Sequence, residues 1–367
     1  MERNSRKMNS KKVGIITIND YNYGNRLQNY ALQQAVRDIG REPESIYFND
    51  VSKKYYLSRS KSCIHRFVKF FTPIAIIRKK NERYFRPAQR AFDKFTEEYI
   101  SSKTIKIKRH KEINKAVNCG EYYCFLAGSD QIWNPKFAGN DYYFLTFAED
   151  RQKKSYAASI GFKDVPESVQ DKWEEYWNSF EEITVREESA AKIIDRLTGK
   201  KPKVVLDPTL LVEKKIWDTL SDEADVPMEL EGTINKNYIF MFFIGDIPEE
   251  AEKYKNDNNY TVVDISDERG TTRQKVGPIE FVKLVRNAQM ILTDSYHCLV
   301  FAVIYQKKYK AYQRNSIGLE SMTSRMEELF NITGLGYVME SEEYEDVNKR
   351  LESKRKESYK ILRQMIE

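Results

Sequence analysis

Short runs of apolar, often β-branched residues alternate with amphipathic stretches along almost the whole chain. The stretch with Leu27, Ala31, Ala35 and Ile39 repeats its apolar positions every four residues and ends at Gly40, which is typical of a helix. Alternation of strand and helix patterns indicates an α/β fold with parallel sheets. The expected strands lie at 13–18, 45–48, 122–127, 155–160, 183–185, 204–206, 238–244, 261–265, 290–293 and 309–312.

The alternation is interrupted once, at a short segment with Gly199 and Pro202, and then starts again. A length of 367 residues suits two domains. We therefore expect two Rossmann-like α/β domains that face each other across a cleft. The expected parts are 1–200 with a basic helical insertion at about 53–94, then 201–340, and a charged C-terminal helix at 341–367.

Composition narrows the class of protein. Hydrophobic residues make up 41% and aromatic residues 13%, which argues against disorder. The four cysteines form no Cys-x-x-Cys pair and there are only three histidines, so we expect neither a disulfide framework nor a structural zinc site. The chain shows neither a signal peptide nor an apolar run of the roughly 18 residues that a membrane span needs, so we expect a cytoplasmic protein.

Positive charge is concentrated in one segment. Between Lys53 and Lys94, 13 Lys and Arg face two acidic residues, a local net charge of +11 in a chain of +6. Basic residues interleaved with aliphatic and aromatic residues fit an element that meets anionic lipid at the inner face of the cell membrane. An ordinary helical pair with snorkelling basic side chains fits equally well. We expect no nucleic-acid partner, since no recognition motif accompanies the charge.

Ligands of open α/β sheets bind beyond the carboxyl ends of the strands, so we considered the loops that follow strands. The first loop leads into a helix with Asn25 and Arg26, where a helix N-terminus favours an anion or a sugar hydroxyl. The second contains Gly128, Ser129 and Asp130, which fit a site loop and a simple helix N-cap equally well.

Two further loops contain Arg186 and His297. Arg186 fits a clamp for a carboxylate or phosphate, or a local salt bridge with its acidic neighbours. Asp294, Ser295 and His297 follow a strand and open a helix, which favours a catalytic over a structural histidine. No Gly-x-Ser-x-Gly turn supports a hydrolase. No Asp-x-Asp is present to hold a metal-bound nucleotide sugar, so we expect no metal and no cofactor.

Several of these motifs, taken as a set and in order, resemble the polysaccharide pyruvyl transferase family. The resemblance covers roughly residues 13–335, and one departure is Cys298, where members typically have glycine after the histidine. The motifs are Tyr-Gly-Asn-Arg-Leu-Gln-Asn-Tyr-Ala-Leu-Gln from Tyr23, Gly-Ser-Asp-Gln-Ile-Trp-Asn from Gly128, Ala-Ser-Ile-Gly from Ala158, Val-Arg-Glu-Glu-Ser from Val185, Leu-Asp-Pro-Thr-Leu-Leu from Leu206 and Thr-Asp-Ser-Tyr-His from Thr293.

The resemblance implies a GT-B-like fold and a chemistry. Such enzymes move an enolpyruvyl unit from phosphoenolpyruvate onto a sugar, as a ketal, in a cell-surface polysaccharide or its lipid-linked precursor. The N-terminal domain is then the acceptor side and the C-terminal domain the phosphoenolpyruvate side. A glycosyltransferase that uses a nucleotide sugar, and a catalytically silent scaffold for envelope assembly, remain as alternatives.

Motif position and chemistry together assign roles to single residues. His297 is the expected general acid and base, because histidine titrates near working pH, and Asp130 is the second expected catalytic residue. Arg186, Arg314 and Arg325 are the expected partners of the donor's phosphate and carboxylate. The other expected substrate-binding residues are Asn25, Arg26, Gly128, Ser129, Asp294 and Ser295.

Overall fold

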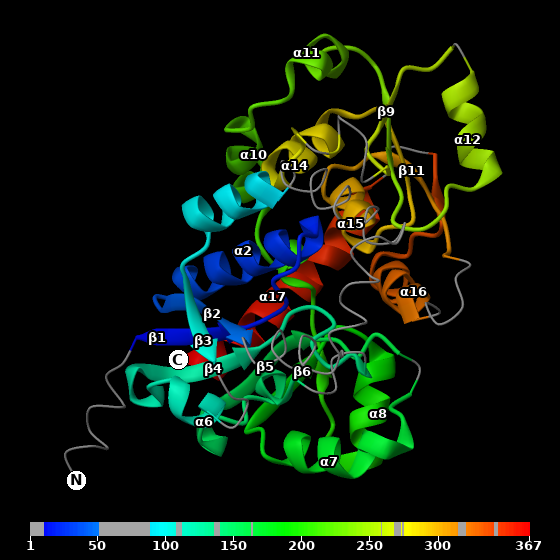
Figure 1. The fold of residues 1–367 in the computed structure, drawn as a ribbon. Helices are drawn as coiled ribbons and strands as arrows, with labels where there is room; N and C mark the ends of the chain where they lie inside the picture. The colour runs from blue at the N-terminus through cyan, green and yellow to red at the C-terminus, as the bar shows by residue number, and fades with distance from the viewer. Residues whose placement is uncertain are drawn as a thin grey trace, which may run out of the picture.

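A computed structural model places the chain in two parallel sheets, one above the other (Figure 1). The structure describes residues 11–50, 89–107, 112–135, 140–162, 164–257, 259–267, 273, 275–314, 321–340 and 344–367. The α/β architecture with two halves that the sequence predicts is confirmed by this arrangement.

The first sheet has seven parallel strands in the order β3-β2-β1-β4-β5-β6-β7. The order reverses between β1 and β4, which is the kind of position where open α/β sheets bind ligands. The strands are β1 (Lys12–Ile16), β2 (Glu42–Asp50), β3 (Ser102–Ile107), β4 (Tyr122–Ala127), β5 (Lys153–Ala158), β6 (Glu182–Val185) and β7 (Lys203–Val204).

The second sheet has five strands in the order β12-β11-β10-β8-β9, and only β12 runs antiparallel to its neighbour. Its order reverses between β8 and β10. The strands are β8 (Ile239–Phe242), β9 (Val262–Asp264), β10 (Met290–Thr293), β11 (Lys308–Ala311) and β12 (Val338–Met339).

Helices cover both sheets. Strand residues alternate between two cores, because successive side chains in a strand point to opposite faces: Leu126 lies in the core shared with the second half, and Phe125 in the core on the opposite face of the first sheet. The helices are α2 (Tyr23–Asp38), a helix at 89–99, α6 (Ile113–Ala116), α7 (Glu167–Asn178), α8 (Glu188–Thr198), α9 (Pro208–Leu211), α10 (Lys214–Asp222), α11 (Met228–Ile234), α12 (Glu249–Asn256), α14 (Pro278–Asn287), α15 (Tyr296–Ile304), α16 (Ser321–Thr333) and α17 (Glu345–Ile366), with short 3-10 helices η2 (Cys119–Glu121), η4 (Asp141–Phe144) and η5 (Asp150–Gln152).

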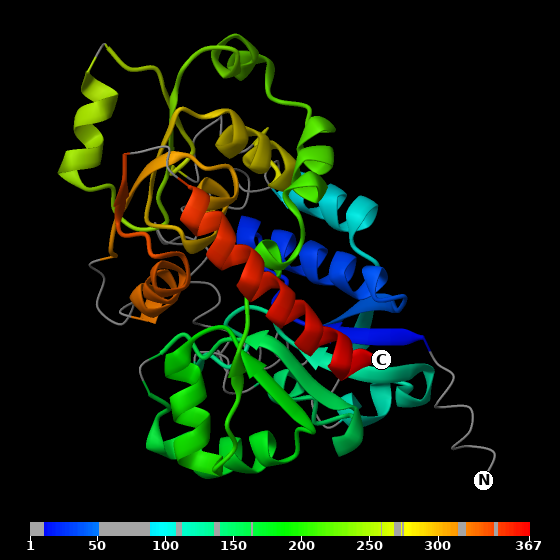
Figure 2. The same ribbon diagram turned by 180° about the vertical axis from the view of Figure 1, so that it is seen from behind.

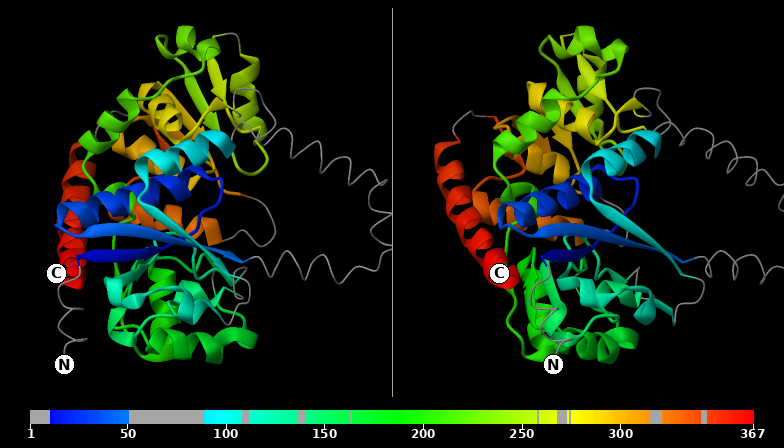
Figure 3. Two further views of the ribbon diagram at one scale, coloured as in Figure 1. Left: turned by 60° about the vertical axis from the view of Figure 1, so that its left-hand side comes forward. Right: turned by 90° about the vertical axis from the view of Figure 1, so that its left-hand side faces the viewer.

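Helix α2 lies between the two sheets, as the side views show (Figure 3). At its start the ring of Tyr23 stacks on Phe281 of α14, with centroids 4.4 Å apart, and its hydroxyl donates to the carbonyl of Val276 at 2.9 Å. Buried aromatic pairs of this kind add to the stabilisation from apolar burial. The first turn of α2 is therefore fixed against the second half of the molecule.

Helix α17 crosses the back of the molecule from the second half to the first (Figure 2). Its Ser358 hydroxyl accepts from the backbone nitrogen of Leu206 at 3.0 Å, and Arg355 donates to the carbonyl of Leu210 at 3.0 Å. The C-terminal helix expected from the sequence thus joins the two halves.

Two expectations about the fold need correction. The run at 204–206 was expected to open the second half, but Val204 pairs with Val185, so β7 is the edge strand of the first sheet. The sequence pattern also misses β3, an exposed edge strand in which lysines interrupt the apolar alternation. Most of the basic segment, 53–88, lies outside the described residues, so its membrane-facing role stays a prediction.

Candidate active site

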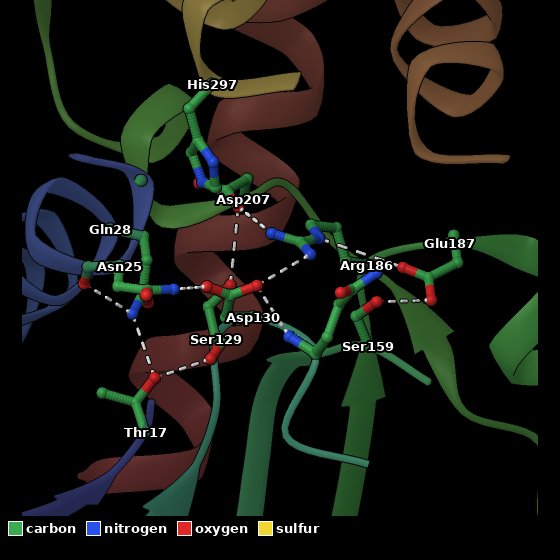
Figure 4. A network of polar contacts seen from close by, with 12 residues as sticks. Thr17, Asn25, Gln28, Ser129, Asp130, Ser159, Arg186, Glu187, Asp207 and His297 are labelled. Atoms are coloured by element: carbon green, nitrogen blue, oxygen red, sulfur yellow. Dashed lines mark hydrogen bonds and ion pairs between the residues drawn. The ribbon is translucent and has the colours of Figure 1, made fainter. Parts of the chain in front are cut away.

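Three loops that follow strands meet at the point where the two sheets approach each other (Figure 4). Two of these loops, the one after β1 that leads into α2 and the one after β4, flank the position where the strand order of the first sheet reverses. The third follows β10 beside the order reversal of the second sheet and brings His297. We call the buried polar cluster that they form with the segments after β6 and β7 the arginine network. It consists of Asn25, Ser129, Asp130, Arg186, Glu187, Asp207 and His297.

Arg186 is the centre of this network and is only 2% exposed. Its Nη1 donates to Oδ2 of Asp207 at 2.6 Å, Nη2 lies 3.6 Å from Oδ1 of Asp130, and Nε lies 3.9 Å from Oε2 of Glu187. Burial by itself would lower the pKa of Arg186, but Asp207 and Asp130 outweigh it and raise that pKa. Arg186 is therefore a permanently charged residue that three carboxylates surround.

The salt bridge between Arg186 and its sequence neighbour Glu187, which the sequence allowed, contributes little to the arginine network. Glu187 is farther from Arg186 than Asp207 is, and only one of its carboxylate oxygens lies toward the guanidinium. Its Oε1 accepts from the Ser159 hydroxyl at 2.8 Å and from the backbone nitrogen of Ile160 at 3.2 Å. Glu187 thus ties the loop after β5 to the network.

Asp207 belongs to the arginine network but was not predicted as a site residue, although its motif contributed to the family resemblance. It is 1% exposed and caps α9, accepting from the Thr209 nitrogen at 2.9 Å and from the Thr209 hydroxyl at 2.6 Å. Burial opposes ionisation, but His297 and Arg186 hold the pKa of Asp207 well below its usual range. Aspartate before proline at the end of a strand was the available signal, since that pair marks a helix start.

His297 reaches the network from the second half. Its Nε2 lies 3.7 Å from Oδ2 of Asp207 and makes no hydrogen bond with any residue the structure describes. The ring packs so closely on α2 that a Cβ on Gly24 would lie 2.0 Å from Nδ1. The missing side chain of Gly24 therefore lets His297 approach Asp207.

Asp130 joins the network to the start of α2. It accepts a hydrogen bond from the Asn25 amide and another from the backbone nitrogen of Gln131 at 2.7 Å. Burial raises its pKa, but Arg186 and His297 lower it more, and the net direction is down. Asp130 is therefore held in the ionised form.

A chain of side-chain hydrogen bonds fixes this corner of the site. Gln28 donates to the Thr17 hydroxyl and to the carbonyl of Asn25, both at 3.0 Å. The Thr17 hydroxyl donates to the carbonyl of Ser129 at 2.8 Å, and the Ser129 hydroxyl lies 3.5 Å from Oδ2 of Asp207. Gly128 precedes this segment with a positive φ of 120°.

Arg325 lies next to the arginine network, on α16. It is 4% exposed, and its guanidinium carbon lies 5.5 Å from the centroid of the Tyr296 ring, while that of Arg186 lies 5.1 Å from the same ring. Burial and the nearby Arg186 lower the pKa of Arg325 to about 10. Two arginines thus share one aromatic ring at the edge of the site.

Other predicted site residues lie apart from this network. Arg314 donates from Nε to Oδ2 of Asp294 at 2.9 Å, and Asp294 also accepts from the backbone nitrogens of Ile244 and Gly245 at 2.8 Å each. This separate cluster fixes the carboxyl ends of β8, β10 and β11. Ser295 is buried at the N-terminus of α15.

Arg26, another residue predicted to bind substrate, also lies outside the arginine network. Its Nη1 donates to the carbonyl of Asp20 at 3.1 Å, and its guanidinium carbon lies 6.0 Å from the centroid of the Phe92 ring. Arg26 is buried and braces the loop after β1. It does not contact the arginine network.

Neither a metal-ligand cluster nor a membrane-spanning helix occurs among the described residues. They contain no group of three or more His, Cys, Asp and Glu side chains arranged to hold a metal ion. Within the same part of the chain, every helix is too short or too polar to cross a membrane.

Comparison with known structures finds proteins of similar overall shape and low sequence identity. A protein described as a UDP-N-acetylglucosamine 2-epimerase from Listeria monocytogenes is 12% identical, with a TM-score of 0.49, over 97% of this chain and 91% of its own. The UDP-N-acetylglucosamine 2-epimerase of Neisseria meningitidis is 9% identical, with a TM-score of 0.43, over 96% and 98%. The glycosyltransferase SnogD from Streptomyces nogalater is 12% identical, with a TM-score of 0.40, over 97% and 95%.

Comparison at the level of sequence is more informative about the family. Curated protein sequences give no significant match. Residues 22–308, however, match the family of polysaccharide pyruvyl transferases. This range includes the start of α2 and the loops after β4, β6, β7 and β10 that build the arginine network. The chain belongs to the polysaccharide pyruvyl transferase family.

Proposed function

We propose that this pyruvyl transferase takes its enolpyruvyl group from phosphoenolpyruvate and joins it as a ketal to two hydroxyls of a sugar in a surface polysaccharide or its precursor. The observation that carries the proposal is the Arg186–Asp207–His297 contact, which unites both halves of the chain at one buried point. This contact places a fixed cation, Arg186, close to His297, whose ring can carry a proton.

Arg186 has hydrogen-bonding capacity left for an anion. Its Nε and Nη2 are buried and make no hydrogen bond within the described chain, although carboxylates lie at ion-pair distance. A buried donor without a hydrogen bond costs about 1–3 kcal/mol. A carboxylate or phosphate oxygen of the donor would satisfy these nitrogens, and Arg325 adds a second positive charge near them.

His297 supplies the proton that the chemistry needs. The donor's C3 must become a methyl group, and Nε2 of His297 is buried without a hydrogen bond to the described residues. The carboxylate of Asp207 lies 3.7 Å from Nε2 and stabilises the positive charge on the ring before the proton leaves. Asp207 orients His297 and Arg186 and is a positioning residue.

The transfer balances in two steps. In the first, C3 gains a proton from His297 while the oxygen of one sugar hydroxyl bonds to C2 and its proton returns to the imidazole. In the second, the oxygen of the other hydroxyl bonds to C2, the bond between C2 and the bridging oxygen breaks, and inorganic phosphate leaves with that hydroxyl's proton. Asp130 is held ionised and can accept a hydrogen bond from the reacting hydroxyl.

Mass spectrometry of a complete reaction tests this proposal. The full chain is incubated with phosphoenolpyruvate and a set of soluble and lipid-linked oligosaccharides, and inorganic phosphate is measured in parallel. We expect an acid-labile pyruvyl addition to one acceptor with one phosphate released per addition. Transfer of a hexose from a nucleotide sugar, with phosphoenolpyruvate untouched, would contradict the proposal and support a glycosyltransferase.

The same set of soluble and lipid-linked acceptors tests whether the enzyme works at the membrane surface. If the enzyme works at the inner face of the membrane, lipid-linked acceptors in anionic vesicles should react faster than their lipid-free analogues. Replacing Arg78, Lys79 and Lys80 with glutamate should remove that advantage, because anionic surfaces attract each basic residue by about 1 kcal/mol. Equal rates on both acceptors before the replacement would contradict a membrane role.

A further inference from the structure

A separate cavity of about 340 Å³ opens beside the arginine network, at the carboxyl side of β1, β2 and β3. Its volume is in the range of sites for small molecules, which is about 300–1,000 Å³. We call it the Asp20 groove. The residues that line it are Thr17, Asn19, Asp20, Ile46, Tyr47, Phe48, Asn49, Thr104, Tyr142 and Tyr143.

Polar side chains of the Asp20 groove are available to a ligand. Those of Asn19, Asp20, Asn49 and Thr104 are exposed and make no hydrogen bond with any residue the structure describes. They come from the loop after β1, from β2 and from β3, so three neighbouring chain segments direct unused donors and acceptors to one place. Such a mixture of amides, a hydroxyl and a carboxylate matches a ligand that carries several hydroxyls.

Aromatic rings form part of the wall. The ring of Phe48 lies 4.9 Å from that of Tyr142, and the rings of Tyr142 and Tyr143 are 4.6 Å apart, measured between centroids. Tyr47 is held in place by a hydrogen bond that its hydroxyl accepts from Asn29 at 2.8 Å. Rings beside polar groups suit a ligand with apolar C–H faces and polar edges, which is the character of a sugar ring.

Charge separates this groove from the arginine network. No lysine or arginine is among the described residues that line it, and Asp20 contributes a carboxyl group. Arg26 lies behind Asp20 and binds its carbonyl. Although solvent reaches the side chain of Asp20, its partial burial and the nearby Asp130 raise its pKa. A donor with a phosphate and a carboxylate is therefore disfavoured in the groove, whereas a neutral glycan is not.

Thr17 links the groove to the proposed reaction centre. Thr17, which lines the groove, donates to the carbonyl of Ser129 at 2.8 Å, and Ser129 directly precedes Asp130. A sugar seated in the groove would therefore contact Thr17, which holds the backbone next to Asp130.

We propose that the Asp20 groove binds the sugar acceptor and presents its hydroxyl pair to Asp130. This inference rests on the proposed function, because it assigns the second substrate of that reaction. Asp20 and Asn49 hold the hydroxyls away from the reacting edge, and Tyr142 with Phe48 contacts the ring faces. Specificity for the acceptor is thus determined by the first half of the chain, away from the arginines.

Direct binding tests the groove without depending on turnover. Methyl glycosides of glucose, galactose and N-acetylmannosamine are titrated against the full chain, and binding is followed by saturation-transfer NMR. Asn49→Trp fills the groove and should abolish binding, and Asp20→Asn should weaken it about tenfold, because an amide oxygen accepts a weaker hydrogen bond than a carboxylate does. Asp38→Asn, which lies at a different cavity beside α17, is the matched control and should bind as the parent does.

Kinetics separate failure of the groove from failure of the proposed function. Where pyruvyl transfer occurs, Asp20→Asn should raise KM for the acceptor and leave kcat and KM for phosphoenolpyruvate unchanged. If the parent binds glycosides, Asn49→Trp does not, and no phosphate is released from phosphoenolpyruvate, the groove assignment stands and phosphoenolpyruvate is not the donor. If pyruvyl transfer occurs and neither variant changes KM for the acceptor, the groove assignment is wrong while the proposed function stands. The groove assignment is also wrong if the glycosides do not bind to the parent, or if they bind to both variants as well as to the parent.

Discussion

The arginine network and the Asp20 groove lie beside each other at the carboxyl edge of the first sheet, yet their polar groups are arranged in opposite ways. In the network, Arg186 and Asp207 are buried and neutralise each other at 2.6 Å. In the groove, Asp20 and Asn49 are exposed and without a hydrogen-bond partner in the described chain.

This difference in burial and pairing matches the ligand that we propose for each region. Buried charges interact strongly, because the surroundings screen them little, so a fixed network can organise a small anion and a proton transfer. Exposed amides and hydroxyls exchange readily with water, so a groove can accept and release a larger neutral glycan. Variants in the two regions should therefore change different quantities.

The largest effect is expected at His297. His297→Ala should lower kcat about 10²–10⁴-fold, which is the usual contribution of a positioned acid or base. Binding of methyl glycosides should stay unchanged, because the groove has no contact with the ring. The melting temperature should change little, since Asp207 keeps its bond to Arg186. A variant that turns over like the parent would contradict the assignment of His297.

Removing Asp207 should mainly affect stability. Asp207→Ala leaves Arg186 buried beside an apolar side chain, and breaking a buried pair in this way costs about 3–5 kcal/mol of unfolding free energy. Asp20→Ala, in the exposed groove, should change that free energy by less than about 0.5 kcal/mol. Urea unfolding of both variants provides the comparison. Similar losses in both would show that the two carboxylates are not in different environments.

Gly24 should be sensitive to a single methyl group. Gly24→Ala places a Cβ 2.0 Å from Nδ1 of His297, so either the ring or the helix must move, and overpacking of this kind costs about 1–3 kcal/mol. Gly232→Ala, in α11, where an added Cβ would meet no atom of another part of the chain within 4 Å, is the control and should gain stability from better helix propensity. Thermal unfolding and kcat are measured for both. Equal behaviour of the two variants would show that Gly24 does not position His297.

Lowering the pH should change the contributions of Asp207 and Asp20 to the free energy of unfolding in opposite directions. The folded-state pKa of Asp207 is depressed, so its stabilisation is present above the unfolded value of about 3.9 and is lost as pH falls toward the folded pKa. The folded-state pKa of Asp20 is raised, so its charge slightly destabilises the fold at neutral pH and the penalty disappears below about pH 4.

These signs give a small but specific prediction for Asp20→Asn. The urea midpoint should rise slightly at pH 7 and equal that of the parent at pH 3, whereas Asp207→Asn should lose more stability at pH 7 than at pH 3. The measurement is a set of urea titrations at both pH values. A fall in the midpoint of Asp20→Asn at pH 7 would contradict the raised pKa.

The sequence predicts those parts of the molecule that local patterns determine. The strands expected at 122–127 and 290–293 are confirmed residue for residue, because both are buried apolar runs with clear ends. The exposed edge strand β3 was missed for the opposite reason, since solvent on one side permits lysines in it.

The site shows the same limit. Sequence proximity offered Glu187 and Glu188 as salt-bridge partners of Arg186, but the nearest carboxylate is that of Asp207, which the parallel crossover from β6 to β7 brings beside it. The Asp20 groove was not foreseen either, because Phe48 and Tyr142 meet only after β2 and η4 have folded together. Pairings between distant segments are set by tertiary packing, which no local period encodes.

The fate of the bridging oxygen of phosphoenolpyruvate tests the central claim most directly. Phosphoenolpyruvate labelled with oxygen-18 between C2 and phosphorus is reacted with the acceptor, and the released phosphate is analysed by mass spectrometry. Ketal transfer breaks the bond between C2 and that oxygen, so the account predicts that the label leaves in the phosphate. Unlabelled phosphate would show that the bond to phosphorus breaks instead, and would contradict pyruvyl transfer by this enzyme.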